Sequence, residues 1–190
     1  YADGAASSRA EVALVVDPQS ARLVNDQNPL VAQIYQATRN KLNRLGAPFE
    51  VFSFNDLARA DLKPFKLLLF PGLFELTPEK SALLGKVALR EGRTAVFAYA
   101  PGISDDRTLD PERVKALTGT AFKTPGVSTV KRDGWTSVYA GSYEALTPAV
   151  LRPLLARFLR RTVPQLKVLS HAEVPEGKQI KVTSLVGGAA

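Results

Sequence analysis

The stretch KLLLFPGLFELTPEKSALLGKVALREG, residues 66–92, carries the pattern that decides the fold. It opens with an unbroken apolar run, which is typical of a strand buried on both faces. A Pro-Gly pair ends that strand, and Thr77 followed by Pro78 predicts the start of a helix, because Thr caps free N–H groups and Pro fits the first turn. Glu79 adds an acidic group that the helix dipole favours. We expect this helix to run to Gly92.

Strands and helices alternate on both sides of this stretch. Because strands that alternate with helices form right-handed crossovers, the order predicts a largely parallel sheet covered on both faces. A short turn or helix is expected at residues 55–62. The other predicted elements are strands at EVALVVD (11–17), APFEVFSF (47–54) and TAVFAYA (94–100), and a helix at PLVAQIYQATRNKLNRLG (29–46).

The C-terminal half continues with shorter elements. Asp110 and Gly119 mark the two ends of a predicted helix. Short strands are expected around Pro-Gly and Asp-Gly turns at 125–126 and 133–134. A last helix begins after Thr147, and Pro153 should kink or restart it.

The sequence predicts one principal domain with two appendages. Residues 1–10 read as a linker or flexible N-terminus, and residues 11–162 as the α/β domain. Residues 163–190 read as a β extension of two strands whose role the sequence leaves open. The opening YADGAASSRA has neither an initiator Met nor an apolar signal core, which predicts a processed or excised chain.

Composition excludes several classes of function. The chain has 190 residues, which suits one domain, and no Cys, which excludes disulfides and thiol catalysis. His171 is its single histidine, so one chain cannot build a multi-histidine metal centre. The net charge of +7 is spread along the chain without interleaved aromatic residues, so we expect no nucleic-acid partner. No apolar run approaches the length of a membrane span, so we expect a soluble protein, and a bacterial cytoplasmic and a secreted location both fit.

Motifs for the common cofactors are absent. The first strand is followed by DPQSARLV, which has no glycine for a dinucleotide and is a poor imitation of a flavin phosphate loop. No glycine-rich loop ends in Lys-Ser or Lys-Thr, as a nucleoside triphosphate would need. We therefore expect no cofactor and no metal.

Candidate binding residues follow the predicted strands. In an open parallel sheet, ligands collect at the carboxyl ends of the strands. Asp17, Glu75, Tyr99, Ser104 and Asp105 come at or just after such ends. Loop capping is the alternative role for Asp17 and helix-dipole stabilisation the alternative for Glu75, because both residue types are common in such turns.

The stretch FAYAPGISD, residues 97–105, has the place of a nucleophile elbow. Such an elbow reads Gly-x-nucleophile-x-Gly, since close packing of strand on helix leaves little room for side chains. Aligned on Gly102, the nucleophile position is Ala100, which cannot attack a substrate. Ser104 lies beyond the turn, and its one candidate base, His171, lies far along the chain. We therefore expect no catalytic residue.

Four phrases together resemble a known family: EVALVVD, RNKLNRLGAPFEVFSFNDL, FKLLLFPGLFELTPEKSALL and LREGRTAVFAYAPGISD. They are similar to the amidotransferase-like, β-galactosidase trimerisation-like α/β domain of multidomain glycoside hydrolases related to family 42. The resemblance covers roughly residues 11–141, including GWTSVYAG at 134–141.

This resemblance implies a flavodoxin-like, class I glutamine amidotransferase-like three-layer sandwich that has lost the ancestral cysteine. It implies that the catalytic carboxylates lie on a preceding barrel, so this chain alone would not be an enzyme. The partners would be further copies of the chain or an adjoining barrel, and carbohydrate as a ligand. Two alternatives remain: a small-ligand-binding or sensory domain with its site at the strand ends, and a degenerate hydrolase that uses Ser104.

Overall fold

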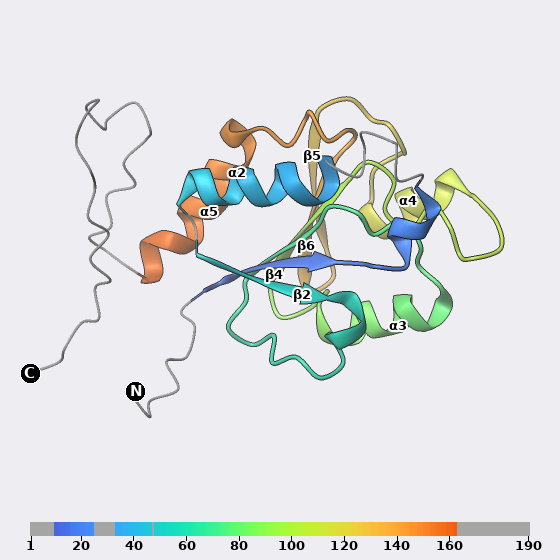
Figure 1. Ribbon diagram of the computed structural model, residues 1–190, viewed down its shortest axis with the longest axis horizontal. Coiled ribbons are helices and arrows are strands. Elements are labelled where there is room, and N and C mark those ends of the chain that lie inside the picture. The colour runs from blue at the N-terminus through green and yellow to red at the C-terminus, as the bar shows by residue number, and fades with distance from the viewer. Residues whose placement is uncertain (1–9, 25–32, 47, 163–190) are drawn as a thin grey trace, which may run out of the picture.

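The computed structural model describes residues 10–24, 33–46 and 48–162, and its centre is a six-stranded sheet (Figure 1). The strands lie in the order β2-β1-β3-β4-β6-β5, and every neighbouring pair is parallel except β5 and β6. The chain is therefore a mixed α/β protein with a mostly parallel sheet. The strands are β1 (Val12–Val16), β2 (Phe49–Ser53), β3 (Leu67–Phe70), β4 (Arg93–Ala98), β5 (Val127–Arg132) and β6 (Trp135–Ala140).

The central strands are apolar on both faces. Leu14, Leu69 and Val96 point to one face of the sheet and belong to one buried cluster. Leu68 and Phe97, one residue along in their strands, belong to a second buried cluster on the other face. This alternation explains the unbroken apolar runs of the sequence, because successive residues of a strand point to opposite faces.

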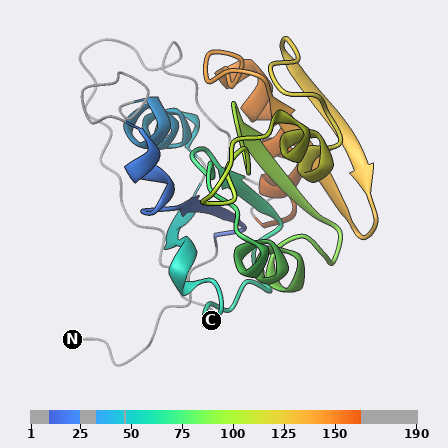
Figure 2. The ribbon, with the colours of Figure 1, turned by 90° about the vertical axis from the view of Figure 1, so that its right-hand side faces the viewer.

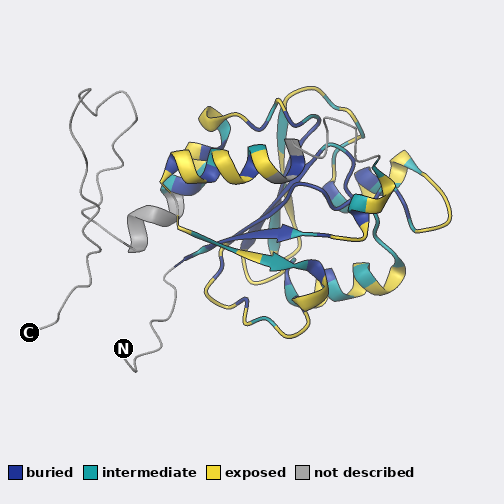
Figure 3. Ribbon diagram, viewed as in Figure 1, coloured by how far each residue is buried: buried dark blue, intermediate teal, exposed yellow. Residues whose placement is uncertain are grey.

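Helices cover both faces of the sheet (Figure 1). The first cluster is closed by α2 (Thr38–Leu45) and α5 (Pro148–Thr162), and the second by α3 (Pro78–Val87) and α4 (Pro111–Thr118). Figure 2 shows α2 and α3 on opposite sides of the strands. Figure 3 shows dark blue strands and helices with exposed outer faces, so the two cores lie between the layers. The short elements are η1 (Ser20–Leu23), η2 (Gln33–Ala37) and η3 (Phe54–Asp56).

The predicted starts of α3 and α4 are confirmed. Thr77 Oγ1 accepts a hydrogen bond from the Lys80 N–H at 3.3 Å, with Pro78 in the first turn of α3. The carboxylate of Asp110 caps α4 in the same way, and Gly119 ends that helix with a φ of 81°. The cap residues were readable in the sequence because they satisfy N–H groups that the helix itself leaves unpaired.

One predicted helix end is wrong. We expected α3 to run to Gly92, but it ends at Val87. Arg93 donates from its guanidinium to the carbonyl of Val87 at 3.1 Å, so this orphan carbonyl is satisfied by a side chain. Glu91 and Gly92 then turn the chain with φ values of 59° and 70°, which are not helical. The apolar pattern continues past Val87 because Leu89 still packs on the core.

The other elements largely follow the sequence. β5 and β6 form a hairpin whose turn lies at the predicted Asp133–Gly134. α5 continues through Pro153 as one helix, so the expected restart does not occur. Residues 29–32 of the predicted first helix, the N-terminal residues 1–9 and the tail 163–190 lie outside the described residues.

Two glycines should respond in opposite ways to alanine. A Cβ at Gly141 would collide with the backbone carbonyl of Thr124, which cannot move without shifting its loop. Gly85 lies exposed in α3 with open space around it. We expect Gly141→Ala to lower the free energy of unfolding by about 2 kcal/mol, and Gly85→Ala to raise it by about 0.5–1 kcal/mol. Urea denaturation measures both, and equal effects would contradict the packing described for Gly141.

Candidate functional site

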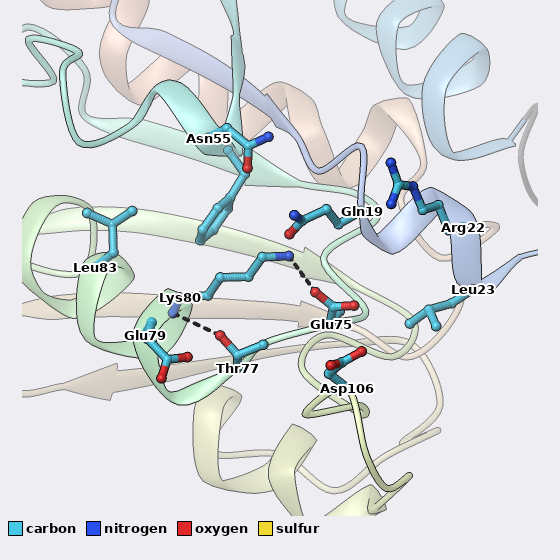
Figure 4. Close-up of a pocket in the computed structure, with 11 residues that line it drawn as sticks. Gln19, Arg22, Leu23, Asn55, Glu75, Thr77, Glu79, Lys80, Leu83 and Asp106 are labelled. Carbon is cyan, nitrogen blue, oxygen red and sulfur yellow. Dashed lines mark hydrogen bonds and ion pairs between the residues drawn. The ribbon is translucent and has the colours of Figure 1, made fainter.

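A cavity of about 670 Å³ opens at the carboxyl ends of the parallel strands (Figure 4). In open α/β sheets, ligands bind at these carboxyl ends of the strands. Four separate segments form its walls: η1 with the residue before it, η3, the β3–α3 turn with α3, and the loop after β4. The lining residues are Gln19, Arg22, Leu23, Phe54, Asn55, Glu75, Thr77, Glu79, Lys80, Leu83 and Asp106.

Asp17 lies beneath this cavity, directly after β1, and is only 1% exposed. Its carboxylate accepts hydrogen bonds from the Ser20 hydroxyl at 2.5 Å and from the backbone N–H groups of Gln19 and Ser20, both at 3.3 Å. Asp17 thus closes the turn between β1 and η1, which is the loop-capping role given as its alternative. A buried carboxylate also needs a counter-charge, and Lys80 supplies it.

Lys80 connects the two predicted carboxylates. Its Nζ lies 3.0 Å from Asp17 Oδ2 and 2.9 Å from Glu75 Oε1, and the Lys80 side chain is 11% exposed. The ammonium also lies 5.6 Å from the centre of the Phe54 ring, within reach of a cation–π interaction. Thr77 fixes where α3 begins and so brings Lys80, three residues later, under the cavity.

Ser20 joins the same network from the other side. Its hydroxyl donates to Asp17 and accepts the backbone N–H of Glu75 at 2.8 Å. The end of β1 and the β3–α3 turn are therefore bound to each other by side chains as well as by the sheet. The network holds Glu75 in one position at the cavity wall.

In the turn after β4, the residue with a left-handed backbone conformation is Tyr99. Tyr99 has a φ of 61°, which is uncommon for a non-glycine residue. Its N–H donates to the Ala140 carbonyl at 2.8 Å, and its carbonyl accepts the Tyr139 hydroxyl at 2.6 Å. Burial raises the pKa of Tyr139, which keeps this donor protonated. The left-handed residue is thus one position before Ala100, where the alignment on Gly102 had placed the nucleophile.

Tyr99 and Ser104 do not line the cavity. The ring of Tyr99 packs against Phe74, Phe122 and Tyr143 with centroid distances of 5.7–6.3 Å. Ser104 is 4% exposed, and its hydroxyl accepts the Asp106 N–H at 3.1 Å. Its backbone pairs with Glu75 in an isolated bridge, which ties the loop to the β3–α3 turn.

Asp105 belongs to a separate small network. It forms an ion pair with Arg113 at 2.7 Å and accepts the N–H groups of Thr108 and Arg107 at 2.8 and 3.0 Å. The hydrogen bond from Thr108, then that from Arg107, holds the pKa of Asp105 below its ordinary value, and the Arg113 charge adds to this. Asp105 fixes the loop that carries Asp106 to the cavity.

The structure therefore brings Asp17 and Glu75 together around Lys80. Ser104 meets Glu75 only through its backbone, and the side chains of Tyr99, Ser104 and Asp105 belong to other contacts. Sequence reasoning missed Lys80 and Ser20, which complete the network. Their signals were available: Ser20 follows Asp17 by three residues, as in a capping pattern, and Lys80 follows the Thr-Pro helix start. His171, the expected partner of Ser104, lies outside the described residues.

Within residues 10–24, 33–46 and 48–162, no cluster of His, Asp and Glu side chains is arranged to hold a metal ion. In the same residues, no helix has the length and apolar character needed to cross a bilayer.

Two solved structures with a similar fold are β-galactosidases. A catalytic mutant of a GH42 β-galactosidase from G. stearothermophilus aligns with a TM-score of 0.56 and 16% identity, over 80% of this chain and 30% of that chain. The β-galactosidase from the psychrophilic Marinomonas ef1 aligns with a TM-score of 0.50 and 15% identity, over 88% and 30%. What this chain shares with these enzymes is the fold.

Curated relatives by sequence are of a different kind, and no protein-family model matches the chain. The flagellar biosynthesis protein FlhA of Proteus mirabilis is 60% identical over 38 residues, which are 20% of this chain and 6% of that protein. FlhA of Salmonella typhimurium is 33% identical over 130 residues, covering 58% of this chain and 18% of that protein. The chain thus spans less than a fifth of the length of these relatives.

Removing the shared cation should destabilise the protein strongly. We expect Lys80→Met to lower the free energy of unfolding by about 3 kcal/mol, because it leaves a buried carboxylate without its counter-charge. Lys86→Met, an exposed change on the same helix, is the control and should have an effect within about 0.5 kcal/mol. Chemical denaturation measures both, and equal stabilities would disprove the role given to Lys80.

The lowered pKa of Asp105 predicts an acid-dependent stability. The ionised carboxylate stabilises the fold, so Asp105→Asn should lower the melting temperature at neutral pH. This difference should be complete above the ordinary pKa of 3.8 and should vanish as the pH falls through the lower pKa of the folded state. Thermal melts of both proteins between neutral and strongly acidic pH test this, and a difference that is independent of pH would refute it.

Proposed function

We propose that this chain is a non-catalytic α/β domain of a carbohydrate-active, β-galactosidase-like protein, in which it serves subunit assembly or shapes a neighbouring sugar site. One observation carries the proposal: the fold likeness takes in 80% of this chain but 30% of the GH42 chain. That ratio is what one domain within a larger glycoside hydrolase would give.

The strand order supports the finer assignment. The parallel order β2-β1-β3-β4, with helices on both faces, is the start of the flavodoxin-like arrangement. The turn after β4 lies where an amidotransferase-like domain would present its nucleophile, and it carries Tyr99 and Ala100. A flavodoxin-like, amidotransferase-like domain that has lost its nucleophile accounts for both features.

An edge strand supports assembly with other chains. Among the described residues, β2 is one edge of the sheet; its sequence FEVFS has one charged residue, Glu50, and neither Lys nor Pro, and its Val51 is 56% exposed. Natural edge strands are commonly protected by such residues, and β5 at the other edge ends in Lys131 and Arg132. The partner at β2 would be another copy of this chain or an adjoining barrel domain.

The flagellar relatives lead to no rival assignment of function. They are matched over less than a fifth of their length, and the named process belongs to those whole proteins. In both kinds of relative, the matched region is a part of a longer chain.

A second candidate function is the binding of a small ligand at the strand ends. The cavity of about 670 Å³ favours it, because its volume lies in the range of small-molecule sites. Asp17 and Glu75 would then act from the network around Lys80. This function and assembly through β2 use different surfaces and can be tested separately.

The assembly proposal predicts self-association without hydrolysis. We expect the purified chain to form oligomers in size-exclusion chromatography with light scattering and to leave chromogenic glycosides uncleaved. A glycosidase needs two carboxylates about 5–10 Å apart across a sugar-sized cleft. Val51→Lys should shift the oligomer toward the monomer by placing a charge on the β2 edge, while Thr129→Lys on the exposed face of β5 should not.

A monomeric wild-type chain at all concentrations would overturn assembly with further copies. Hydrolysis of a glycoside by the purified chain would overturn the non-catalytic role.

A further inference from the structure

The cavity wall carries hydrogen-bonding groups from several segments (Figure 4). Gln19 directly precedes η1, Arg22 lies in η1, Asn55 lies in η3, and Asp106 lies in the loop after β4. Amides, a guanidinium and carboxylates together can donate to and accept from many hydroxyl groups at once. Leu23 and Leu83 add smaller apolar areas between them.

Glu75 is the fixed acceptor of this cavity. Lys80 binds its Oε1, Ser20 accepts its N–H, and the Glu75 side chain is 13% exposed. Within the part of the chain that the structure describes, its second oxygen, Oε2, makes no hydrogen bond. A carboxylate oxygen that is held in place, nearly buried and still able to accept is a preorganised contact for a ligand hydroxyl.

The charges of the wall disfavour anions. Three carboxylates line the cavity, those of Glu75, Glu79 and Asp106. Two cations line it as well, but the ammonium of Lys80 is already shared between Asp17 and Glu75. A phosphate or a nucleotide would therefore meet more negative than positive charge.

The wall also lacks a surface for flat aromatic ligands. Phe54 is the aromatic residue of the lining, and it is 1% exposed, with Lys80 over its ring. A nucleobase or a flavin would find no open ring on which to stack. A volume of about 670 Å³ accommodates a ligand as large as a mono- or disaccharide.

We propose that this cavity binds a neutral polyhydroxylated ligand, a monosaccharide or a short oligosaccharide. Glu75 and Asp106 accept from its hydroxyl groups, and Arg22, Gln19 and Asn55 bind it from the opposite wall. The proposal rests on the second candidate function, ligand binding at the strand ends, and names its ligand class. It is independent of assembly through β2.

Titration of the ¹⁵N-labelled chain by NMR tests the ligand class. The probes are D-galactose, D-glucose and D-xylose as neutral ligands, spermidine as a cation, and AMP and inorganic phosphate as anions. We expect at least one sugar to shift the amide resonances around Glu75 and Asp106 in a saturable way at millimolar concentrations. Spermidine, AMP and phosphate should not saturate these shifts.

Two matched variants locate the site. Asp106→Asn should weaken sugar binding about tenfold, since it removes a charged acceptor. Asp133→Asn is the control. It makes the same change in the β5–β6 turn, which lies at the amino ends of the parallel strands, away from the cavity, and it should leave the affinity unchanged. Both residues are exposed, and equal melting temperatures confirm that the variants are folded.

Two results would overturn the inference in different ways. Saturable binding of spermidine or AMP in place of the sugars would preserve ligand binding and refute the sugar class. Absence of any saturable shift would refute the inference and the ligand-binding candidate together, and the oligomer measurements would be unaffected.

Discussion

The arrangement at the strand ends depends on one buried cation. Lys80 lies between Asp17, which directly follows β1, and Glu75, which precedes α3. Without it, two carboxylates would face each other at low exposure, an arrangement that proteins tolerate poorly. With it, the turn after β1, the β3–α3 turn and the first turn of α3 become one rigid unit. These turns form the wall of the cavity next to Glu75. They cannot move apart without separating the Lys80 ammonium from the carboxylates of Asp17 and Glu75, so this wall is held in place.

Much of the fold could be predicted from residues that act locally. Thr77, Asp110 and Gly119 mark helix ends because each satisfies or permits a particular backbone geometry within a few residues. The end of α3 could not be predicted, because it depends on Arg93, a residue of the next strand, reaching back to the carbonyl of Val87. Leu89 is apolar because it packs on the core, so the helical spacing of apolar residues continues in the sequence beyond the last residue of α3.

The candidate site was predictable only in part, for the same reason. Asp17 and Glu75 were found by their positions after strands, but the contact between them runs through Lys80 and Ser20, which are 63 and 3 residues from Asp17 along the chain. Tyr99 was expected at the site, yet its left-handed backbone turns the ring into an aromatic cluster. The alignment to the elbow motif compares residue types at fixed spacing. It does not predict that Tyr99 rather than Ala100 adopts the left-handed backbone conformation.

The two edges of the sheet differ in a way that limits how copies can add to it. β5 ends in the two basic residues Lys131 and Arg132, and β2 has the exposed Val51 at its centre and one acidic residue, Glu50. In the proposed assembly, a second copy that joins through β2 by a two-fold axis would pair the β2 edges of both chains and leave the basic edges outward. Under the proposed assembly, growth would stop at a closed pair, because the next addition would have to bring two basic edges together. The contrast between the two edges would then limit this assembly to two copies rather than an open fibre.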